Sequence, residues 1–450
     1  MKSRQKQSRK NETHIPEVFL HYLWRLKNFD LSKLTTTEGE EMIILQSGFS
    51  NSDSGPDFQE AKIRIGRTLW AGSVEIHTLS SDWLRHAHQH DPAYDKVILH
   101  VVFREDQIIY NRNQIRIPCL ELESRIDASI LNEMWSLYQS RDWIPCAPSI
   151  EQVPKLTIDA WLERLLVERL IEKTKRIEQE LERTRNDWQE SFYRMLAYNF
   201  GFLKNSIPFI QLARSLPLKL LLRHKDKPVQ IEALLFGQAG LLNQDFKDEY
   251  PQKLKKEYLF LQNKYRLAPI PAHHWKFMRL RPANFPTIRI AQFANLWFKT
   301  EYLFNKILAV KTVTEMENLF NVKVSWYWKT HYRFDEASTS KSKRLGKSSI
   351  QLLLINTVIP FLFQYGRYFR MKDLEDKAMR LLSECPPETN MIIRRWKKLN
   401  VPCENAFHSQ ALLFLKAGYC DKRKCLSCSI GNHLIQHSSS DQGKRPAPQK

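Results

Sequence analysis

Hydrophobic and polar positions follow two different periods along this chain of 450 residues. Up to about residue 150, short apolar stretches alternate with polar positions or run continuously between turn-forming residues, which is typical of β-strands. The strands that this pattern predicts lie at 41–45, 61–65, 68–78 and 97–103. A helix is predicted from Pro16 to about Asn28 and a second from Ser81 to about His90, because Pro and Ser suit the first positions of helices. The order is therefore helix, three strands, helix and strand, followed by a hairpin at 108–120.

From Thr157 the period changes to the 3.6 residues of amphipathic helices, with one apolar stripe through Leu162, Leu166 and Leu170. The predicted fold class is therefore an α/β N-terminal domain with a mixed sheet, followed by a largely α-helical region. The predicted parts are a disordered basic leader at 1–14, the α/β domain at 15–150, an α-helical domain at 151–400, a cysteine-rich segment at 401–434 and a disordered tail at 435–450.

The longest apolar run, 350–363, predicts a buried helix and not a membrane span. Gln351, Asn356 and Pro360 interrupt it, and it is shorter than the roughly 20 apolar residues that a transmembrane helix needs. The leader has no apolar core, so it resembles neither a secretory signal nor an anchor. Three of the 7 cysteines gather near the C-terminus and form no spread disulfide framework. We therefore predict a cytoplasmic protein without a membrane partner.

The formal net charge is +20, from 69 Lys and Arg against 49 Asp and Glu. Such an excess favours a polyanionic partner, DNA or RNA, because counterions released from phosphates drive binding. The candidate nucleic-acid-binding cations lie in a stretch interleaved with aromatic residues and in a Ser- and Lys-rich loop; they are Lys276, Arg279, Arg281, Lys343, Arg344 and Lys347. The aromatic residues of the first stretch, such as Trp275, are more often core anchors than base-stacking groups.

Candidate chemistry gathers in the predicted sheet. Asp57 stands in a loop ahead of one strand, and Glu75 and His77 lie in the next strand. Because side chains alternate faces along a strand, Glu75 and His77 point the same way while Ile76 points into the core. Two carboxylates and an imidazole at one end of a sheet predict a divalent-metal hydrolytic site. The alternative is that Asp57 caps a turn while Glu75 and His77 pair with arginines on an exposed face.

In this order of elements, Pro56-Asp57 followed by Glu75-Ile76-His77 resembles the PD-(D/E)xK nuclease superfamily, which has the restriction-endonuclease-like fold. The separation of 18 residues between the carboxylates is what a hairpin between them requires. The resemblance implies that Asp57, Glu75 and the backbone carbonyl of Ile76 hold Mg²⁺ or Mn²⁺. It also implies that His77 takes the place of the lysine that positions or deprotonates water. Histidine accepts a proton near neutral pH more readily than lysine does, but it lacks lysine's fixed charge.

Further titratable residues surround this motif. Glu17, on the first predicted helix, is a candidate additional acidic ligand. His86 and His90 stand one turn apart on the second predicted helix and are spaced as a zinc pair, with His77 or Asp91 as a third ligand. Alternatively these histidines contact phosphate or orient the ligands of the nuclease pocket. His77 and His86 are the preferred catalytic candidates among them.

Cys420, Cys425 and Cys428 form a compact group, and Cys403 stands upstream of it. Three cysteines so close together in a reducing compartment are more typical of metal ligands than of inert core residues. Four thiolates would hold Zn²⁺ or a [4Fe-4S] cluster, with Cys403 or, alternatively, His433 as the fourth ligand. The arrangement resembles that of iron-sulfur nucleases of the PD-(D/E)xK class, which carry one distant and three close C-terminal cysteines, although the spacing differs.

Longer segments make the chain similar to an uncharacterised bacterial family of unknown function, from about Glu17 to Leu434. They include GPDF at 55–58, WAGSVEIH at 70–77, QIEALLFGQAGLL at 230–242 and the YC-x4-C-x2-C ending. The first functional hypothesis is a metal-dependent nuclease acting on DNA or RNA. The second is a non-catalytic nucleic-acid-binding or scaffold protein that keeps the fold. The third is a zinc-dependent hydrolase in which His77, His86 and Asp91 converge.

Overall fold

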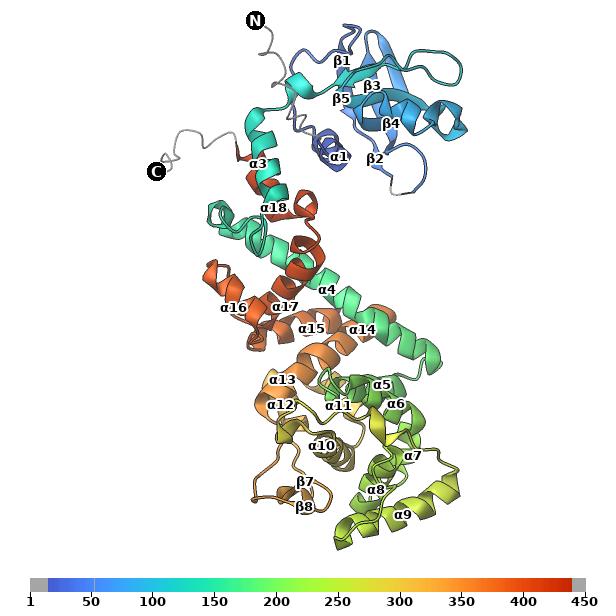
Figure 1. Ribbon diagram of the computed structural model, residues 1–450, viewed down its shortest axis with the longest axis vertical. Helices are drawn as coiled ribbons and strands as arrows, with labels where there is room; N and C mark the ends of the chain where they lie inside the picture. The colour runs from blue at the N-terminus through green and yellow to red at the C-terminus, as the bar shows by residue number, and fades with distance from the viewer. Residues whose placement is uncertain (1–14, 52, 439–450) are drawn as a thin grey trace, which may run out of the picture. The chain divides into compact units, whose positions relative to one another are not determined.

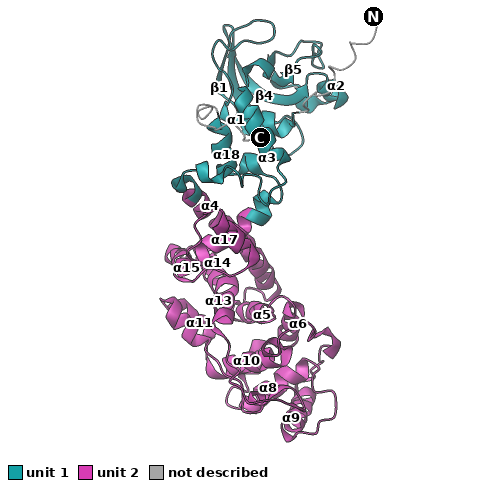
Figure 2. Cartoon of the chain, turned by 60° about the vertical axis from the view of Figure 1, so that its left-hand side comes forward, with its two compact units in different colours: residues 1–158, 416–450 teal, residues 159–415 magenta. Residues whose placement is uncertain are grey.

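The computed structural model describes residues 15–51 and 53–438. The predicted leader at 1–14 and the part of the predicted tail beyond residue 438 lie outside the described residues. The chain divides into two compact units (Figure 2): unit 1 comprises 1–158 and 416–450, and unit 2 comprises 159–415. The cysteine-rich C-terminal segment from Lys416 onward therefore belongs to unit 1, although the sequence analysis treats it as a separate part.

Unit 1 is built on a mixed sheet whose strands follow the order β1-β3-β4-β5-β6 (Figure 1). The strands are β1 (Met42–Gln46), β3 (Phe58–Ile65), β4 (Thr68–Leu79), β5 (Val97–Arg104) and β6 (Cys119–Glu121), with β2 (Phe49–Ser50) paired to the start of β3. The β1-β3 and β3-β4 pairs are antiparallel, whereas β4-β5 and β5-β6 are parallel. A mixed α/β N-terminal domain is thus confirmed, with β5 buried along most of its length as its continuous apolar sequence predicts.

The connection from β4 to β5 is less helical than the sequence predicts. α2 (Asp82–Arg85) has one turn, and the 3₁₀ turns η1 (His88–His90) and η2 (Pro92–Tyr94) follow it. Ala87 has a φ of 60°, which takes the backbone out of the right-handed helical region and ends the helix before the histidines. The predicted hairpin at 108–120 is reduced to a single bridge between Tyr110 and Arg116, because β6 pairs with β5 instead.

The remaining elements of unit 1 are mostly short helices. α1 (Glu17–Leu26) packs against β4, and α18 (Ser429–Gln436) packs against α3 (Ala128–Gln139). The others are η3 (Glu123–Arg125), η4 (Ile150–Gln152), η9 (Lys416–Cys420) and η10 (Cys425–Ser427). α1 begins at Glu17, one residue after Pro16, which caps it, and its apolar residues Phe19, Leu20 and Leu23 are buried.

Unit 2 is largely α-helical, as predicted. It begins within α4 (Lys155–Arg183) and continues through α5 (Trp188–Phe200), α6 (Ser206–Ser215), α7 (Leu218–Leu222), α8 (Pro228–Gln238), α9 (Glu249–Tyr265), α10 (Pro286–Lys299), α11 (Leu303–Ala309), α12 (Val313–Leu319), α13 (Lys347–Leu353), α14 (Ile359–Phe369), α15 (Lys372–Glu384), α16 (Met391–Lys398) and α17 (Ala406–Leu415). Short turns η5 (Ala272–His274), η6 (Pro282–Asn284) and η7 (Tyr327–Lys329) and the two-stranded sheet of β7 (His331–Arg333) and β8 (Glu336–Ala337) connect them, and the π-helical η8 (Leu354–Val358) joins α13 to α14.

One helical stretch among the described residues, Lys347–Phe369, has the length and apolar composition to cross a membrane. Its most apolar window is 72% buried inside the structure, which matches the buried helix that the sequence predicts there. Core helices of folded proteins pass the same length and composition test.

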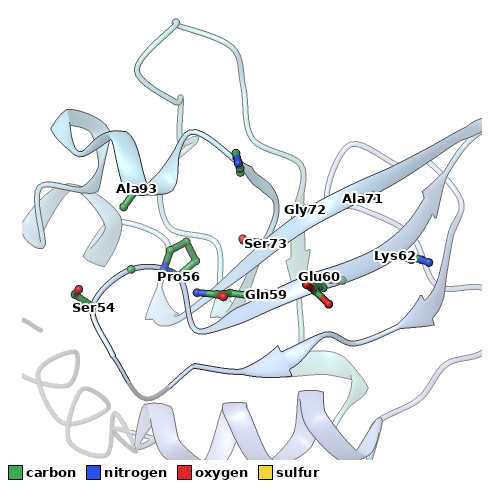
Figure 3. A pocket seen from close by; sticks show the side chains of 12 residues that line it. Ser54, Pro56, Gln59, Glu60, Lys62, Ala71, Gly72, Ser73 and Ala93 are labelled. Atoms are coloured by element: carbon green, nitrogen blue, oxygen red, sulfur yellow. The ribbon is translucent and has the colours of Figure 1, made fainter.

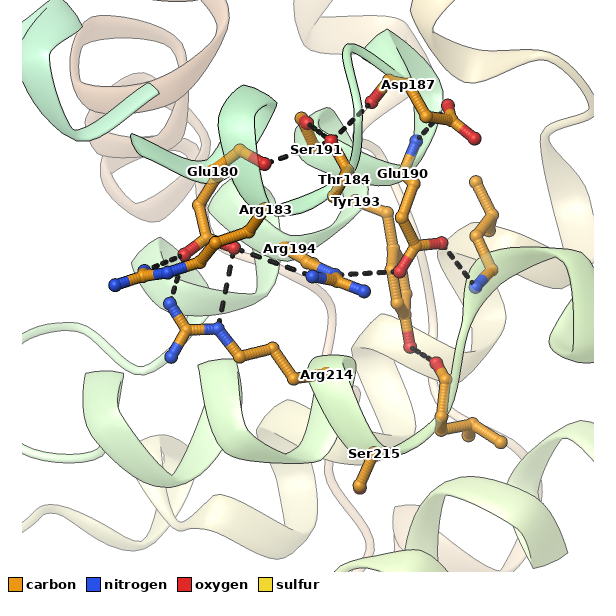
Figure 4. A network of polar contacts seen from close by, with 12 residues as sticks. Glu180, Arg183, Thr184, Asp187, Glu190, Ser191, Tyr193, Arg194, Arg214 and Ser215 are labelled. Atoms are coloured by element: carbon orange, nitrogen blue, oxygen red, sulfur yellow. Dashed lines mark hydrogen bonds and ion pairs between the residues drawn. The ribbon is translucent and has the colours of Figure 1, made fainter. Parts of the chain in front are cut away.

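A buried carboxylate joins three helices of unit 2 (Figure 4). Glu180 of α4 is fully buried. It accepts hydrogen bonds from Arg183, at 2.6 Å, and from Arg214 of α6, and it lies 3.8 Å from Arg194 of α5. Burial raises the pKa of Glu180, but the hydrogen bonds from Arg214 and Arg183 outweigh burial and hold the pKa below its usual range. The charged form of Glu180 therefore stabilises the packing of these helices.

Replacing Glu180 by alanine is expected to lower the free energy of unfolding by about 3–5 kcal/mol, because breaking a buried ion pair leaves its partners uncompensated. Denaturant unfolding followed by circular dichroism measures the effect. Glu182→Ala is the matched control, since Glu182 is an exposed carboxylate on the same helix. Equal, small losses in both variants would show that the Glu180 network contributes little.

Candidate metal centre

The loop before β3 places Asp57 at an open edge of β4. Gly55 has a φ of 101°, a left-handed conformation that favours glycine, and it turns the chain into Pro56 and Asp57. Asn51 fixes the loop, because its side-chain amide donates to the carbonyl of Pro56 at 3.1 Å. The β3-β4 ladder ends where Phe58 pairs with Val74. From Glu75 onward β4 no longer pairs with β3. This edge of β4 therefore faces Asp57.

Asp57 and Glu75 are joined by reciprocal hydrogen bonds. The backbone N–H of Asp57 donates to Glu75 Oε2 at 3.1 Å, and the backbone N–H of Ile76 donates to Asp57 Oδ2 at 3.0 Å. The N–H and C=O of one strand residue point to the same side of the strand. The carbonyl of Ile76 therefore faces the same edge as Asp57. These contacts gather the three oxygen donors that the sequence analysis groups together.

Glu75 and His77 lie on one face of β4, and both are buried, with exposed fractions of 4% and 2%. Burial, the largest cause, and the nearby Asp57 carboxylate together raise the pKa of Glu75 to about 9. A buried acid beside a second carboxylate is destabilised in its charged form. A divalent cation at this position would offset that cost, since it attracts both carboxylates.

Three histidines lie on the side of Glu75 that faces away from Asp57. One nitrogen from each of His77, His86 and His88 lies within 4.8 Å of the other two. Glu75 Oε1 lies 3.3 Å from His88 Nε2 and 3.6 Å from His77 Nε2. Glu75 therefore turns one oxygen toward Asp57 and the other toward the histidines. Imidazole nitrogens and a carboxylate oxygen in this grouping are typical ligands of zinc and other transition metals.

His100 orients His77 from behind. His100 of β5 is fully buried, and its Nε2 lies 2.9 Å from His77 Nδ1. His77 Nε2 lies 3.1 Å from His86 Nδ1. If His77 carries its proton on Nδ1 and donates it to His100, its Nε2 keeps a lone pair that faces His86 and Glu75. A hydrogen bond to the outer nitrogen fixes metal-ligating histidines in the same way in proteins generally.

Other titratable groups from α1 and η2 line this centre. His21 Nε2 lies 3.3 Å from Asp57 Oδ2. Burial raises the pKa of Glu17, and His86, Asp82, His21 and Asp57 also act on it, so Glu17 lies close to the group. The ring of Tyr94 stacks on His88 at a centroid distance of 3.8 Å. Glu17, a candidate additional acidic ligand, therefore belongs to the titratable groups around the centre.

The predicted pair of His86 and His90 on one helix is wrong. α2 ends at Arg85, so His86 is the residue that caps the helix, and the histidine that joins it is His88. Asp91, the predicted third zinc ligand, instead accepts a hydrogen bond from the backbone N–H of Ala93 at 2.9 Å and caps η2. The spacing rule fails here because it assumes a continuous helix through this segment.

A shallow cavity of about 600 Å³ opens next to this loop (Figure 3). Pro56, which directly precedes Asp57, lines it, together with Ser73 of β4. Lys62 and Lys96 add positive charge to its wall. Glu60 also lines the cavity, so its wall carries two cations and one carboxylate beside the candidate metal centre.

The predicted metal ligand Cys403 belongs to a different unit from the other three predicted cysteine ligands. Cys403 is buried in unit 2, and the charged groups that act on its pKa are Lys397 and Glu388. Cys420, Cys425 and Cys428 belong to unit 1. The alternative ligand, His433, stacks on His437 at 4.1 Å.

The predicted nucleic-acid-binding cations have different surroundings. Lys343 is buried, and its Nζ donates to the carbonyls of Trp328, Lys329 and His331, so its charge stabilises unit 2 and is not free to contact phosphate. The other five are exposed; they are Lys276, Arg279, Arg281, Arg344 and Lys347. Trp275, which directly precedes Lys276 in the sequence, is buried and donates a hydrogen bond to the carbonyl of Ala239.

The fold and the site define a mixed α/β unit with a carboxylate-histidine centre, joined to a helical unit. The chain belongs to a family described as protein of unknown function (DUF2851), whose model matches residues 17–391. No curated protein and no solved structure matches the chain. The matched range contains the whole candidate centre but ends before Cys403 and the C-terminal cysteines, short of the extent to Leu434 that the sequence resemblance predicts.

Proposed function

We propose that unit 1 is a divalent-metal-dependent phosphodiesterase that cleaves DNA or RNA. The observation that carries this proposal is the meeting of Asp57, Glu75 and the Ile76 carbonyl at the open edge of β4, beside three histidines. The strand order supports it as well. An antiparallel β1-β3-β4 sheet followed by a parallel β5 resembles the restriction-endonuclease-like core, in which the acidic residues lie at the same places.

The donor set favours Mn²⁺ over Mg²⁺. Oxygen ligands alone suit Mg²⁺, whereas imidazole nitrogens favour transition metals. Asp57 and the Ile76 carbonyl offer oxygens on one side of Glu75, and His77, His86 and His88 offer nitrogens on the other. Glu75 is placed to serve either a single ion or a bridged pair of ions. A bound ion would polarise the phosphoryl group and lower the pKa of a coordinated water.

His77 is better suited to hold a metal than to act as a base. Burial, the largest cause, and the neighbouring His100, His88 and His86 together lower the pKa of His77 to about 2. A general base works best with a pKa near the working pH, so a histidine this weakly basic is a poor proton acceptor. We therefore assign His77 to ligation and orientation, in place of the water-activating role that the resemblance implies.

The positive charge of the chain supports the proposal that the substrate is a polyanion. The chain carries a net charge of +20, and Lys62 and Lys96 line the cavity beside Asp57. A chain with this excess of positive charge favours phosphodiesters over neutral substrates. The reciprocal hydrogen bonds that hold Asp57 and Glu75 together also disfavour the non-catalytic alternative, which would be preferred if the two carboxylates lay too far apart to share an ion.

The histidine group favours a second candidate function, a zinc-dependent hydrolase. In this alternative His77, His86 and His88 hold Zn²⁺, and Glu75 lies beside the ion. Three protein ligands with an open fourth position are typical of catalytic zinc.

The proposal predicts a metal requirement. Protein stripped with EDTA and then supplied separately with Mn²⁺, Mg²⁺ or Zn²⁺ is incubated with labelled single- and double-stranded DNA and RNA. Cleavage is expected with Mn²⁺, more weakly with Mg²⁺, and not with the stripped protein, because the ion supplies the charge stabilisation. Folded, metal-supplied protein that cuts none of these substrates would contradict the nuclease. Hydrolysis of small activated esters with Zn²⁺ alone would favour the second candidate.

A further inference from the structure

The C-terminal cysteines lie beside a loop that is far from them in sequence. Within unit 1, α18 packs against α3 (Figure 2). Arg423 donates hydrogen bonds to the carbonyl of Tyr138 and, at 2.7 Å, to that of Ser140 at the end of α3. Lys416 Nζ lies 5.3 Å from the centroid of the Trp143 ring. These contacts hold the C-terminal segment against the loop that follows α3.

That loop carries Cys146, which is buried with an exposed fraction of 8%. Burial raises the pKa of the Cys146 thiol, and the thiols of Cys428 and Cys425 raise it further. Burial likewise raises the pKa of Cys420, followed by the effects of Cys146, Cys428 and Cys425. The electrostatic interaction between two side chains weakens as the distance between them grows. Together with the contacts of Arg423 at Tyr138 and Ser140 and of Lys416 at Trp143, these effects indicate that the four sulfurs share one neighbourhood, drawn from two distant parts of the sequence.

We propose that Cys146, Cys420, Cys425 and Cys428 bind a [4Fe-4S] cluster. Four cysteine thiolates are the usual ligands of such clusters. Cys146 takes the place that the sequence analysis gives to Cys403. The site is distinct from the carboxylate-histidine centre and does not depend on the function proposed for it.

The spacing of the sulfurs favours a cluster over a single zinc ion. Zinc with Zn–S bonds of about 2.3 Å in a tetrahedron brings its four sulfurs within about 3.8 Å of one another. Among residues 15–51 and 53–438, one group offers three ligand atoms that all lie within 4.8 Å of one another, and it is His77, His86 and His88. No group of three cysteines in these ranges meets the same limit. No three of the four sulfurs are therefore that close. A [4Fe-4S] cluster is a cube of metal and sulfide, so its thiolates stand farther apart than around one ion.

The surroundings suit a cluster with several thiolates. Lys416 and Arg423 act to lower the pKa of Cys420 and Cys425 respectively, so cations stand close to the sulfurs. Gly431 of α18 leaves room for the turn at Cys425 to pack closely against the helix. A Cβ at Gly431 would lie 2.4 Å from the carbonyl oxygen of Cys425 and would push that turn away. The cluster would link the loop after α3 to the C-terminal segment within unit 1.

Anaerobically purified full-length protein tests this proposal. We expect iron and acid-labile sulfide in equal amounts, with a broad visible absorbance that bleaches on reduction with dithionite. Cys146→Ala is expected to lose both signals, while Cys403→Ala, a change of another buried cysteine, keeps them. The wild-type iron, sulfide and zinc contents decide the matter even if Cys146→Ala fails to fold. Stoichiometric zinc without iron, a metal-free protein, or a cluster that survives in Cys146→Ala but not in Cys403→Ala would each overturn the proposal.

Discussion

Glu75→Gln is expected to reduce metal-dependent cleavage by about 10²–10³-fold, the usual loss when a group that stabilises transition-state charge is removed. Glu75 accepts a hydrogen bond from the N–H of Asp57 through one carboxylate oxygen and lies 3.3 Å from His88 Nε2 through the other. Glutamine has the same shape as glutamic acid and can still accept the hydrogen bond from the N–H of Asp57. The variant should therefore fold normally, and the lost activity should reflect the lost ligand.

The matched control for this prediction is Glu41→Gln. Glu41 is an exposed carboxylate beside β1, where Met42 pairs with Ile65 at the end of the sheet opposite Asp57. Initial rates with saturating Mn²⁺ on a labelled oligonucleotide compare the two variants with the wild type. Near wild-type rates in Glu75→Gln would show that the carboxylate is not part of the reaction and would remove Asp57 and Glu75 from the proposed centre.

The double variant His86→Ala/His88→Ala is expected to bind Mn²⁺ and Zn²⁺ at least about 100-fold more weakly. Loss of even an outer hydrogen-bond partner of a metal ligand costs about 10–100-fold in affinity, and two direct ligands should cost at least that much. Both side chains are partly accessible, so truncating them should disturb the core little. Isothermal titration calorimetry on EDTA-stripped protein measures the affinities.

His90→Ala serves as the control for the histidine prediction, because His90 is an exposed histidine of the same segment outside the group of three. Its metal affinity should equal that of the wild type. If the double variant also keeps wild-type affinity for both ions, the histidines are not ligands, and a centre of oxygen donors around Asp57 and Glu75 would remain.

Much of the fold could be predicted from the sequence because local patterns dominate it. The alternation along β4 and the continuous apolar run of β5 give the strands, and Pro16 gives the start of α1. The helix after β4 could not be predicted to end at Arg85, because that depends on the left-handed backbone at Ala87. The same error selects His90 in place of His88 as the partner of His86.

Only part of the candidate metal centre could be predicted from the sequence. Asp57, Glu75 and His77 follow from strand periodicity and a short motif, and the structure brings them together. His100 could not be predicted, since its contact with His77 depends on the parallel pairing of β4 with β5. Cys146 has no neighbouring cysteine in the sequence, and only the packing of α18 against α3 brings it beside the C-terminal cysteines.

Anomalous diffraction from crystals of the full chain soaked in Mn²⁺ tests the metal centre at Glu75 most directly. We expect a peak within coordination distance of Glu75, with further ligands from Asp57 and the Ile76 carbonyl or from His77, His86 and His88. A well-ordered structure with no peak at Glu75, or with Mn²⁺ bound only at unrelated surface carboxylates, would contradict a metal centre at this edge of β4.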